Sequence, residues 1–149
     1  MSHLWLLLHI LGFAMWLGGG LAAMVAGVVA RSESRAALGA VTRAQASMHK
    51  LVIAPGALLV VFSGLILTIR LMNAMVTSLS SWLMVMQGAG ILGALVILLG
   101  GLPIASRLSR LDPEGPHAAH FDELRRRQKV VSSVAGMLGL LALVGGVLS

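Results

Sequence analysis

The residues that could carry chemistry in this sequence are polar side chains set inside long apolar runs. His9 is the one ionisable group between Leu4 and Ala30, a stretch of 27 residues without Lys, Arg, Asp or Glu. An imidazole in hydrocarbon is costly unless it meets a polar partner or a cavity. Imidazole is also a common ligand of metal ions and of haem iron. His9 is therefore the first candidate functional residue.

Two further polar side chains are predicted to lie near the same membrane boundary as His9. With a rise of 1.5 Å per residue, His9, Arg70 and Gln87 each fall within about 8–10 Å of that boundary, so they could converge in one polar layer. A simpler interpretation is that His9 hydrogen-bonds Gln87 or a backbone carbonyl, because such bonds commonly join membrane helices. Both interpretations stay open.

Four methionines near the same boundary offer a second kind of chemistry. Met72, Met75, Met84 and Met86 flank the connection that precedes the third apolar run. A thioether can pair with an imidazole on haem iron, and soft thioethers also select Cu(I). The alternative is that these side chains only fill gaps in an apolar core. Met84 and Met86, two residues apart, point to different sides of a helix.

The remaining histidines are weaker candidates. His49 is predicted on the opposite side of the membrane, about 30 Å or more from His9 along the membrane normal. The two histidines therefore cannot share one haem. Lys50 beside His49 could anchor the helix at the interface. His117 and His120 lie three residues apart on one helical face, and two histidines without acidic partners are a weak metal signal.

The elements that must position these side chains are membrane-spanning helices. Hydrophobic residues make up 58% of the chain and charged residues 11%, which is outside the range of soluble domains. The apolar residues fall into four blocks, each long enough to cross or nearly cross a hydrocarbon core of about 30 Å. The sequence predicts a single transmembrane domain over residues 1–149, an all-α, four-helix antiparallel bundle with helices at about 3–30, 45–72, 82–106 and 128–148.

The distribution of charge predicts the orientation of the bundle. Ten of the eleven Lys and Arg residues fall in the connections 31–50 and 107–129, which emerge on one side, and only Arg70 lies near the other connection. The positive-inside rule places the basic side in the cytoplasm and both termini in the periplasm. The net charge of +6 then reflects topology, so the expected partner is the lipid bilayer and not nucleic acid. We expect a multi-pass protein of the bacterial inner (plasma) membrane.

Composition also excludes several kinds of site. The chain has no cysteine, so disulfides, thiolate metal sites and iron–sulfur clusters are excluded. The four apolar blocks hold no carboxylate, which argues against a carboxylate-based proton relay. No nucleophile–base pair or phosphate loop is present, so no catalytic residue is assigned.

Three stretches resemble a known family. LWLLLHILGFAMWLGGG resembles the first helix of the small four-helix proteins of the HemJ-type protoporphyrinogen oxidase and copper-resistance protein D superfamily. There, a histidine is followed seven residues later by an aromatic residue and then by small residues. MHKLVIAPGALLVVFSGLILTI is similar to their second helix, and WLMVMQGAGILGALVILL to their third.

The resemblance assigns roles to individual residues. It implies that His9 is the haem- or metal-associated histidine of the first helix and Trp16 the aromatic residue after it. Lys50 matches the basic residue that begins the second helix, and Pro55 and Gly64 match the pattern of that helix.

The chain also differs from this family at two places. Gln87 stands where HemJ-type proteins carry a lysine early in the third helix. Leu6, Leu7 and Leu8 occupy the region where a basic residue or histidine commonly lies near the first-helix histidine.

These observations lead to one functional hypothesis and two alternatives. The sequence predicts a protein that binds haem b for a redox role, with His9 as axial ligand, Arg70 near a propionate and Gln87 bonded to the ligand or the haem edge. The resemblance implies porphyrinogen oxidation as the reaction. The first alternative is a copper-handling membrane protein that uses His9 and the four methionines. The second is a non-catalytic bundle, either a subunit of a larger membrane complex or a homo-oligomer.

Overall fold

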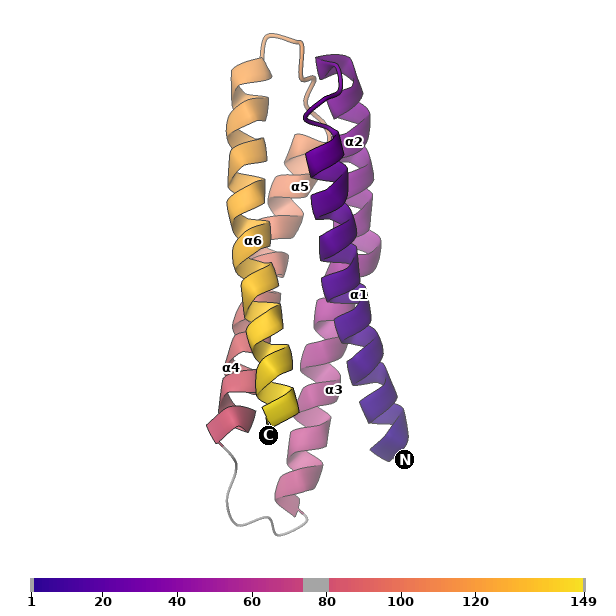
Figure 1. Ribbon diagram of the computed structural model, residues 1–149, viewed down its shortest axis with the longest axis vertical. Coiled ribbons are helices and arrows are strands. Elements are labelled where there is room, and N and C mark those ends of the chain that lie inside the picture. Colours follow the sequence, from indigo (N-terminus) through magenta and orange to yellow (C-terminus); the bar gives the residue numbers. More distant parts are fainter. Residues whose placement is uncertain (1, 74–80, 149) are drawn as a thin grey trace.

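The chain forms a bundle of four long helices in the computed structural model, which describes residues 2–73 and 81–148 (Figure 1). The elements in chain order are α1 (Ser2–Val29), α2 (Arg35–Met48), η1 (His49–Ile53), α3 (Ala54–Asn73), α4 (Ser81–Leu95), η2 (Val96–Gly101), α5 (Leu102–Leu108) and α6 (Ala118–Leu148). The described residues form no strand. The predicted all-α, four-helix architecture is confirmed.

Two of the four helices are composites that run without interruption through a wider turn. α2, η1 and α3 form one helix over Arg35–Asn73, and α4, η2 and α5 form another over Ser81–Leu108. The second helix thus begins near residue 35 instead of the predicted 45. α6 similarly begins at Ala118 and not near residue 128. Alanine-rich and charged sequence favours helix, so these helices continue beyond the apolar blocks from which their limits were predicted.

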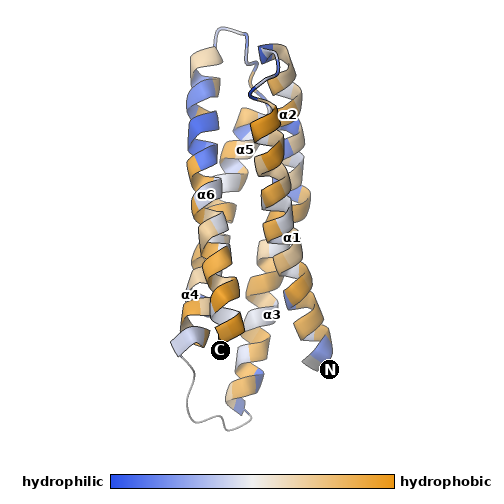
Figure 2. Cartoon of the chain, in the orientation of Figure 1, coloured by the Kyte–Doolittle hydropathy of each residue, from blue (hydrophilic) through white to orange (hydrophobic). Residues whose placement is uncertain are grey.

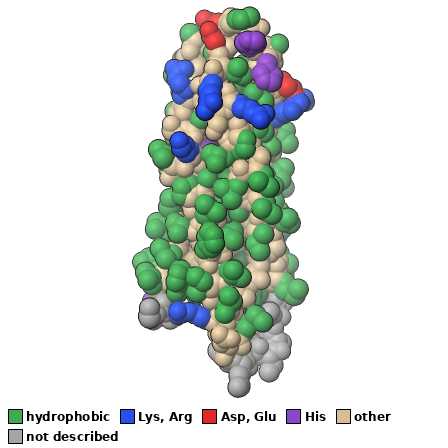
Figure 3. Space-filling model, turned by 180° about the vertical axis from the view of Figure 1, so that it is seen from behind, with side chains coloured by type: hydrophobic (Ala, Val, Ile, Leu, Met, Phe, Trp, Pro, Cys, Tyr) green, Lys and Arg blue, Asp and Glu red, His purple; other side chains and the backbone are tan. Residues whose placement is uncertain are grey.

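All four long helices have the length and apolar character needed to cross a membrane. Large apolar side chains cover the outside of the bundle along most of its length (Figure 3). Such a surface is stable only in contact with lipid or another apolar partner. The protein is therefore a multi-pass integral membrane protein.

The bundle has one strongly charged end. The 39 residues of Arg35–Asn73 extend about 58 Å at 1.5 Å per residue, nearly twice the ~30 Å hydrocarbon core. The hydrophilic parts of α2 and α6 lie together at one end, and both termini point to the opposite end (Figures 1 and 2). We call the end that carries the hydrophilic parts of α2 and α6 the basic end. The opposite end, toward which both termini point, is the terminal end.

Small residues set the distance between the helices. The most extensive contacts join α1 to α3 and α4 to α6. A Cβ atom at Gly12 would lie 2.8 Å from the carbonyl oxygen of Gly56, and one at Gly56 would lie 2.8 Å from the backbone nitrogen of Trp16. A side chain at either glycine would push α1 and α3 apart. Close backbone approach of this kind is how helices associate in lipid.

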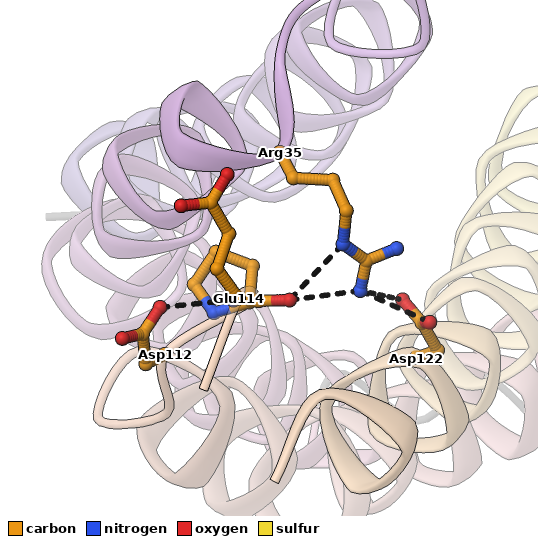
Figure 4. Close-up of polar contacts among 5 residues, drawn as sticks. Arg35, Asp112, Glu114 and Asp122 are labelled. Carbon is orange, nitrogen blue, oxygen red and sulfur yellow. Dashed lines mark hydrogen bonds and ion pairs between the residues drawn. The ribbon is translucent and has the colours of Figure 1, made fainter. Parts of the chain in front are cut away.

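A separate apolar cluster closes the basic end, where α2, α5 and α6 pack together. Its buried members include Leu38, Leu108 and Phe121. Above it, Nε and Nη2 of Arg35 donate to the carbonyl oxygen of Pro113 at 3.0 and 2.9 Å. The same guanidinium forms an ion pair with Asp122 at 3.2 Å (Figure 4). Arg35 thus ties the start of α2 to the α5–α6 connection and to α6.

Candidate cofactor site at His9

His9 is held by α3 through one of its two ring nitrogens. Its Nδ1 lies 3.0 Å from the carbonyl oxygen of Val60 and 3.0 Å from Oγ of Ser63. The hydroxyl of Ser63 donates to the carbonyl of Leu59, so its oxygen is free to accept. Because a carbonyl can only accept, Nδ1 carries the proton and Nε2 carries the lone pair.

The ring of His9 borders a small cavity. Nε2 has no hydrogen-bond partner among residues 2–73 and 81–148. The ring lines a cavity of about 90 Å³ between α1, α3 and α4, whose other walls include Gly64, Met86 and Gln87. The arrangement, Nδ1–H on a backbone carbonyl and a free Nε2, is the one in which histidine ligates metals.

Gln87 shares this cavity with His9 without bonding to it. Its Nε2 donates to Oγ1 of Thr68 on α3, and Thr68 in turn donates to the carbonyl of Gly64 at 2.9 Å. The structure thus brings His9 and Gln87 to one cavity, and each bonds to a different residue of α3. Arg70 is exposed and does not line the cavity.

An aromatic row extends from His9 into the centre of the bundle. The ring of Phe13 meets His9 edge-on with centroids 5.2 Å apart, and it lies parallel to the ring of Trp16 at 6.1 Å. Trp16 is almost fully buried. A Cβ atom at Gly93 of α4 would lie 2.6 Å from its ring. Phe13 thus links His9 to Trp16, and sequence reasoning missed it. Phe13 could have been identified from the sequence, because it follows His9 by four residues and so lies on the same helical face.

Of the three predicted methionines that the structure describes, only one lies near His9. Met86 lines the cavity, whereas Met72 and Met84 are 57% and 66% exposed on the outside of the bundle. Met75 lies outside the described residues. The described residues also contain no group of three or more His, Asp or Glu side chains that could hold a metal ion.

A second histidine centre lies toward the basic end, and sequence reasoning did not find it. His49 is only 5% exposed. Its Nδ1–H donates to the carbonyl of Gln45 at 3.0 Å, and its Nε2 accepts from the amide of Gln128 on α6 at 2.9 Å. That amide also donates to Oγ of Ser132 at 3.3 Å. Lys50, the neighbouring residue, is exposed and takes no part.

Wide helical turns surround this second centre. The N–H of Ala54 bonds to the carbonyl of His49, and that of Leu102 to the carbonyl of Ile97, each five residues back, as in a π-helix. Each wide turn lies just before a proline, Pro55 in one helix and Pro103 in the other. Proline lacks an N–H and crowds the carbonyl four residues before it, so a wider turn relieves the conflict. The two prolines were the features of the sequence from which the wide turns could have been predicted.

The two histidines are closer together than predicted. Ser63, which contacts His9, follows His49 by 14 residues in the same helix, or about 20 Å at 1.5 Å per residue. The prediction of about 30 Å or more was too large, because His9 pairs with α3 deeper in the membrane than its position in α1 suggested. At this separation the two rings still cannot share one iron.

Comparisons with models of protein families, with curated proteins and with solved structures find no match to this chain.

Proposed function

We propose that this integral membrane protein binds haem b for a redox role, and that Nε2 of His9 would hold the iron. The observation that carries the proposal is a histidine ring that lines a cavity between apolar helices, with Nδ1–H fixed on the carbonyl of Val60 and Nε2 without a hydrogen-bond partner in the described residues. A lone pair left in hydrocarbon without a partner is costly unless something binds to it.

The donor set at the cavity suits haem iron. His9 supplies an imidazole nitrogen and Met86, on the facing helix α4, supplies a thioether. Together they make the histidine–methionine pair found in cytochromes c. The bonds from Nδ1–H to Val60 and Ser63 fix the orientation of the ring and increase the basicity of Nε2.

The cavity must widen to admit a macrocycle. Its 90 Å³ is well below the ~300 Å³ at the lower limit for drug-sized ligands. Leu65 and Ile91 are part of its wall, and they are 56% and 47% exposed toward the lipid. α3 and α4 make less extensive contacts than α1 with α3 or α4 with α6. Haem binding therefore requires these two side chains to turn outward, and the ring would enter from the bilayer.

Other residues would orient the bound group. Haem would supply one-electron chemistry at its iron. Gln87 would hydrogen-bond at the haem edge, because its amide already lines the cavity. Arg70 is exposed near the terminal end of α3, where it would take a propionate at the membrane surface. No contact in the described residues favours copper, because Met72 and Met84 are exposed outside the bundle.

A visible spectrum of the purified protein tests the proposal. The chain is purified in mild detergent and titrated with haemin, and we expect a saturable Soret band with one haem per chain. His9→Ala is expected to abolish the saturable band. The matched control is His49→Ala, which removes the other buried histidine and should keep the band if the variant folds.

Two results would overturn the proposal. One is the absence of a saturable Soret band in the wild-type protein. The other is an equal band in His9→Ala, which would show that haem binds elsewhere. His117→Ala, which changes an exposed histidine, serves as a second control should His49→Ala fail to fold.

A further inference from the structure

The cations of the basic end fall into two groups. Arg35 pairs with Asp122, and Arg126 and Arg127 both pair with Glu123. The other Lys and Arg residues at this end form no ion pair within the described chain. All five acidic residues of the sequence lie in this region, but the ten Lys and Arg of the connections 31–50 and 107–129 outnumber them two to one, so the chain cannot neutralise all of its own cations.

Three of these unpaired cations come together where α1 ends beside α6. Ala30, which precedes Arg31, is buried in one apolar cluster with Phe121 and Leu124 of α6, so Arg31 lies beside the part of α6 that carries Arg125 and Lys129. Arg125 and Lys129 are four residues apart on one face of α6, a spacing at which like charges repel. Arg31 follows the end of α1, and the nearby Glu33 forms no ion pair with it. We call Arg31, Arg125 and Lys129 the cation triad.

The cation triad lies directly above lipid-facing apolar surface. On α1, Val28 and Val29 precede Arg31 and are exposed. On α6, Val130 and Met137 follow Lys129 and are also exposed. Figure 3 shows Lys and Arg side chains as a band next to the apolar part of the surface. A cluster of positive charge with exposed apolar side chains beneath it matches an anionic headgroup with acyl chains attached.

We propose that Arg31, Arg125 and Lys129 bind the phosphate headgroup of an anionic phospholipid, whose acyl chains lie along α1 and α6. The phosphate provides the counter-charge that no carboxylate of the chain provides. Basic residues next to a membrane helix attract anionic lipid with about 1 kcal/mol per residue. The apolar strips favour a lipid over a free anion. This site is independent of His9 and of any haem.

Thermal unfolding in detergent with defined additives tests the site. The full chain in a nonionic detergent receives phosphatidylglycerol, phosphatidylcholine or inorganic phosphate. We expect a saturable rise in Tm with phosphatidylglycerol alone. Lys129→Gln should weaken half-saturation about fivefold, and Arg31→Gln with Arg125→Gln and Lys129→Gln should weaken it on the order of a hundredfold.

A charge-matched control separates a site from general attraction. Arg43→Gln with Arg107→Gln and Arg110→Gln removes three unpaired cations from elsewhere at the basic end and should leave half-saturation within about twofold. An equal loss in both triple variants would overturn the proposal. A similar rise with phosphatidylcholine or with phosphate alone would also overturn it. If the cation-triad variant fails to fold, native mass spectrometry counts the phosphatidylglycerol molecules bound to Lys129→Gln and to the wild-type protein. Equal counts would contradict the site.

Discussion

The His9 centre and the His49 centre both orient a histidine ring through its Nδ1–H. They differ in what the second ring nitrogen contacts. In both, Nδ1–H donates to a backbone carbonyl at 3.0 Å, from Val60 in one case and Gln45 in the other. At His49 the second nitrogen accepts a bond from Gln128 at 2.9 Å. At His9 the second nitrogen has no hydrogen-bond partner in the described residues, and the ring lines a cavity. The hydrogen bond to the backbone orients the ring, and the contacts of the other nitrogen determine whether the ring can bind a ligand.

The two histidines also differ in burial, and His49 is the more buried of the two. His49 is buried between α6 and the two wide turns, and a Cβ atom at Gly101 would lie 3.6 Å from its ring. His9 is only partly buried at the seam between α3 and α4. We infer that His49 serves helix packing and that His9 is available to a ligand.

The largest expected effect on stability is at His49. His49→Ala would leave a cavity and remove the partner of the Gln128 amide, with an expected loss of about 2–3 kcal/mol in the free energy of unfolding. His9→Ala should cost about 1 kcal/mol, because its ring already borders a cavity. Unfolding of purified protein in mixed micelles measures both. A larger loss of unfolding free energy in His9→Ala than in His49→Ala would contradict the inference that His49 serves packing and that His9 is available to a ligand.

A double-mutant cycle measures the bond between His49 and Gln128 directly. The variants His49→Leu, Gln128→Leu and their combination should give a coupling of about 1 kcal/mol, within the range seen for hydrogen bonds between membrane helices. Gln128→Leu also removes a buried amide oxygen, Oε1, that has no partner in the described residues. The double variant is therefore expected to be more stable than His49→Leu alone. Additive losses would show that the bond contributes nothing.

Matched glycine substitutions compare the space around the two rings. A Cβ atom at Gly64 would lie 3.0 Å from Cε1 of His9, which is tighter than normal contact, whereas one at Gly101 would lie 3.6 Å from Cδ2 of His49. We expect Gly64→Ala to cost about 1 kcal/mol through crowding and to weaken haem binding. Gly101→Ala should stay within about 0.5 kcal/mol of wild type. Thermal unfolding and the haemin titration check both, and equal effects would contradict the difference in space around the two rings.

The smallest expected effect is at Ser63. Ser63→Ala removes one of the two acceptors of the His9 Nδ1–H, and the carbonyl of Val60 remains at 3.0 Å. The free energy of unfolding should fall by no more than about 0.6 kcal/mol. The Soret band of the haem complex should persist, because Nε2 keeps its lone pair. Loss of the band would show that the hydroxyl, and not the backbone carbonyl, holds the ring.

Much of the fold could be predicted because the relevant physics is local. A helix that crosses a bilayer must be apolar over about 20 residues, and that requirement is visible in the sequence around each of the four blocks. The gathering of the basic connections at one end follows from antiparallel connectivity. The starts of α2 and α6 could not be placed this way, because a helix that continues into water leaves no apolar signal.

The candidate site was only partly predictable. An ionisable group in an apolar run identifies His9 from the sequence alone. Its partners are Val60 and Ser63 and not Gln87, because the approach of Gly12 to Gly56 sets the register of α1 against α3. Register between helices depends on small residues and side-chain shapes from two segments at once.

The sequence by itself determined that this is a four-helix membrane protein with a histidine inside its first helix and its positive charge at one end. Only the tertiary structure decided which histidine keeps a free nitrogen. That outcome depends on Gln128, which lies 79 residues after His49 and meets it at 2.9 Å across the bundle. Hydrophobicity is a property of each segment, whereas a hydrogen bond between helices exists only once the helices are packed.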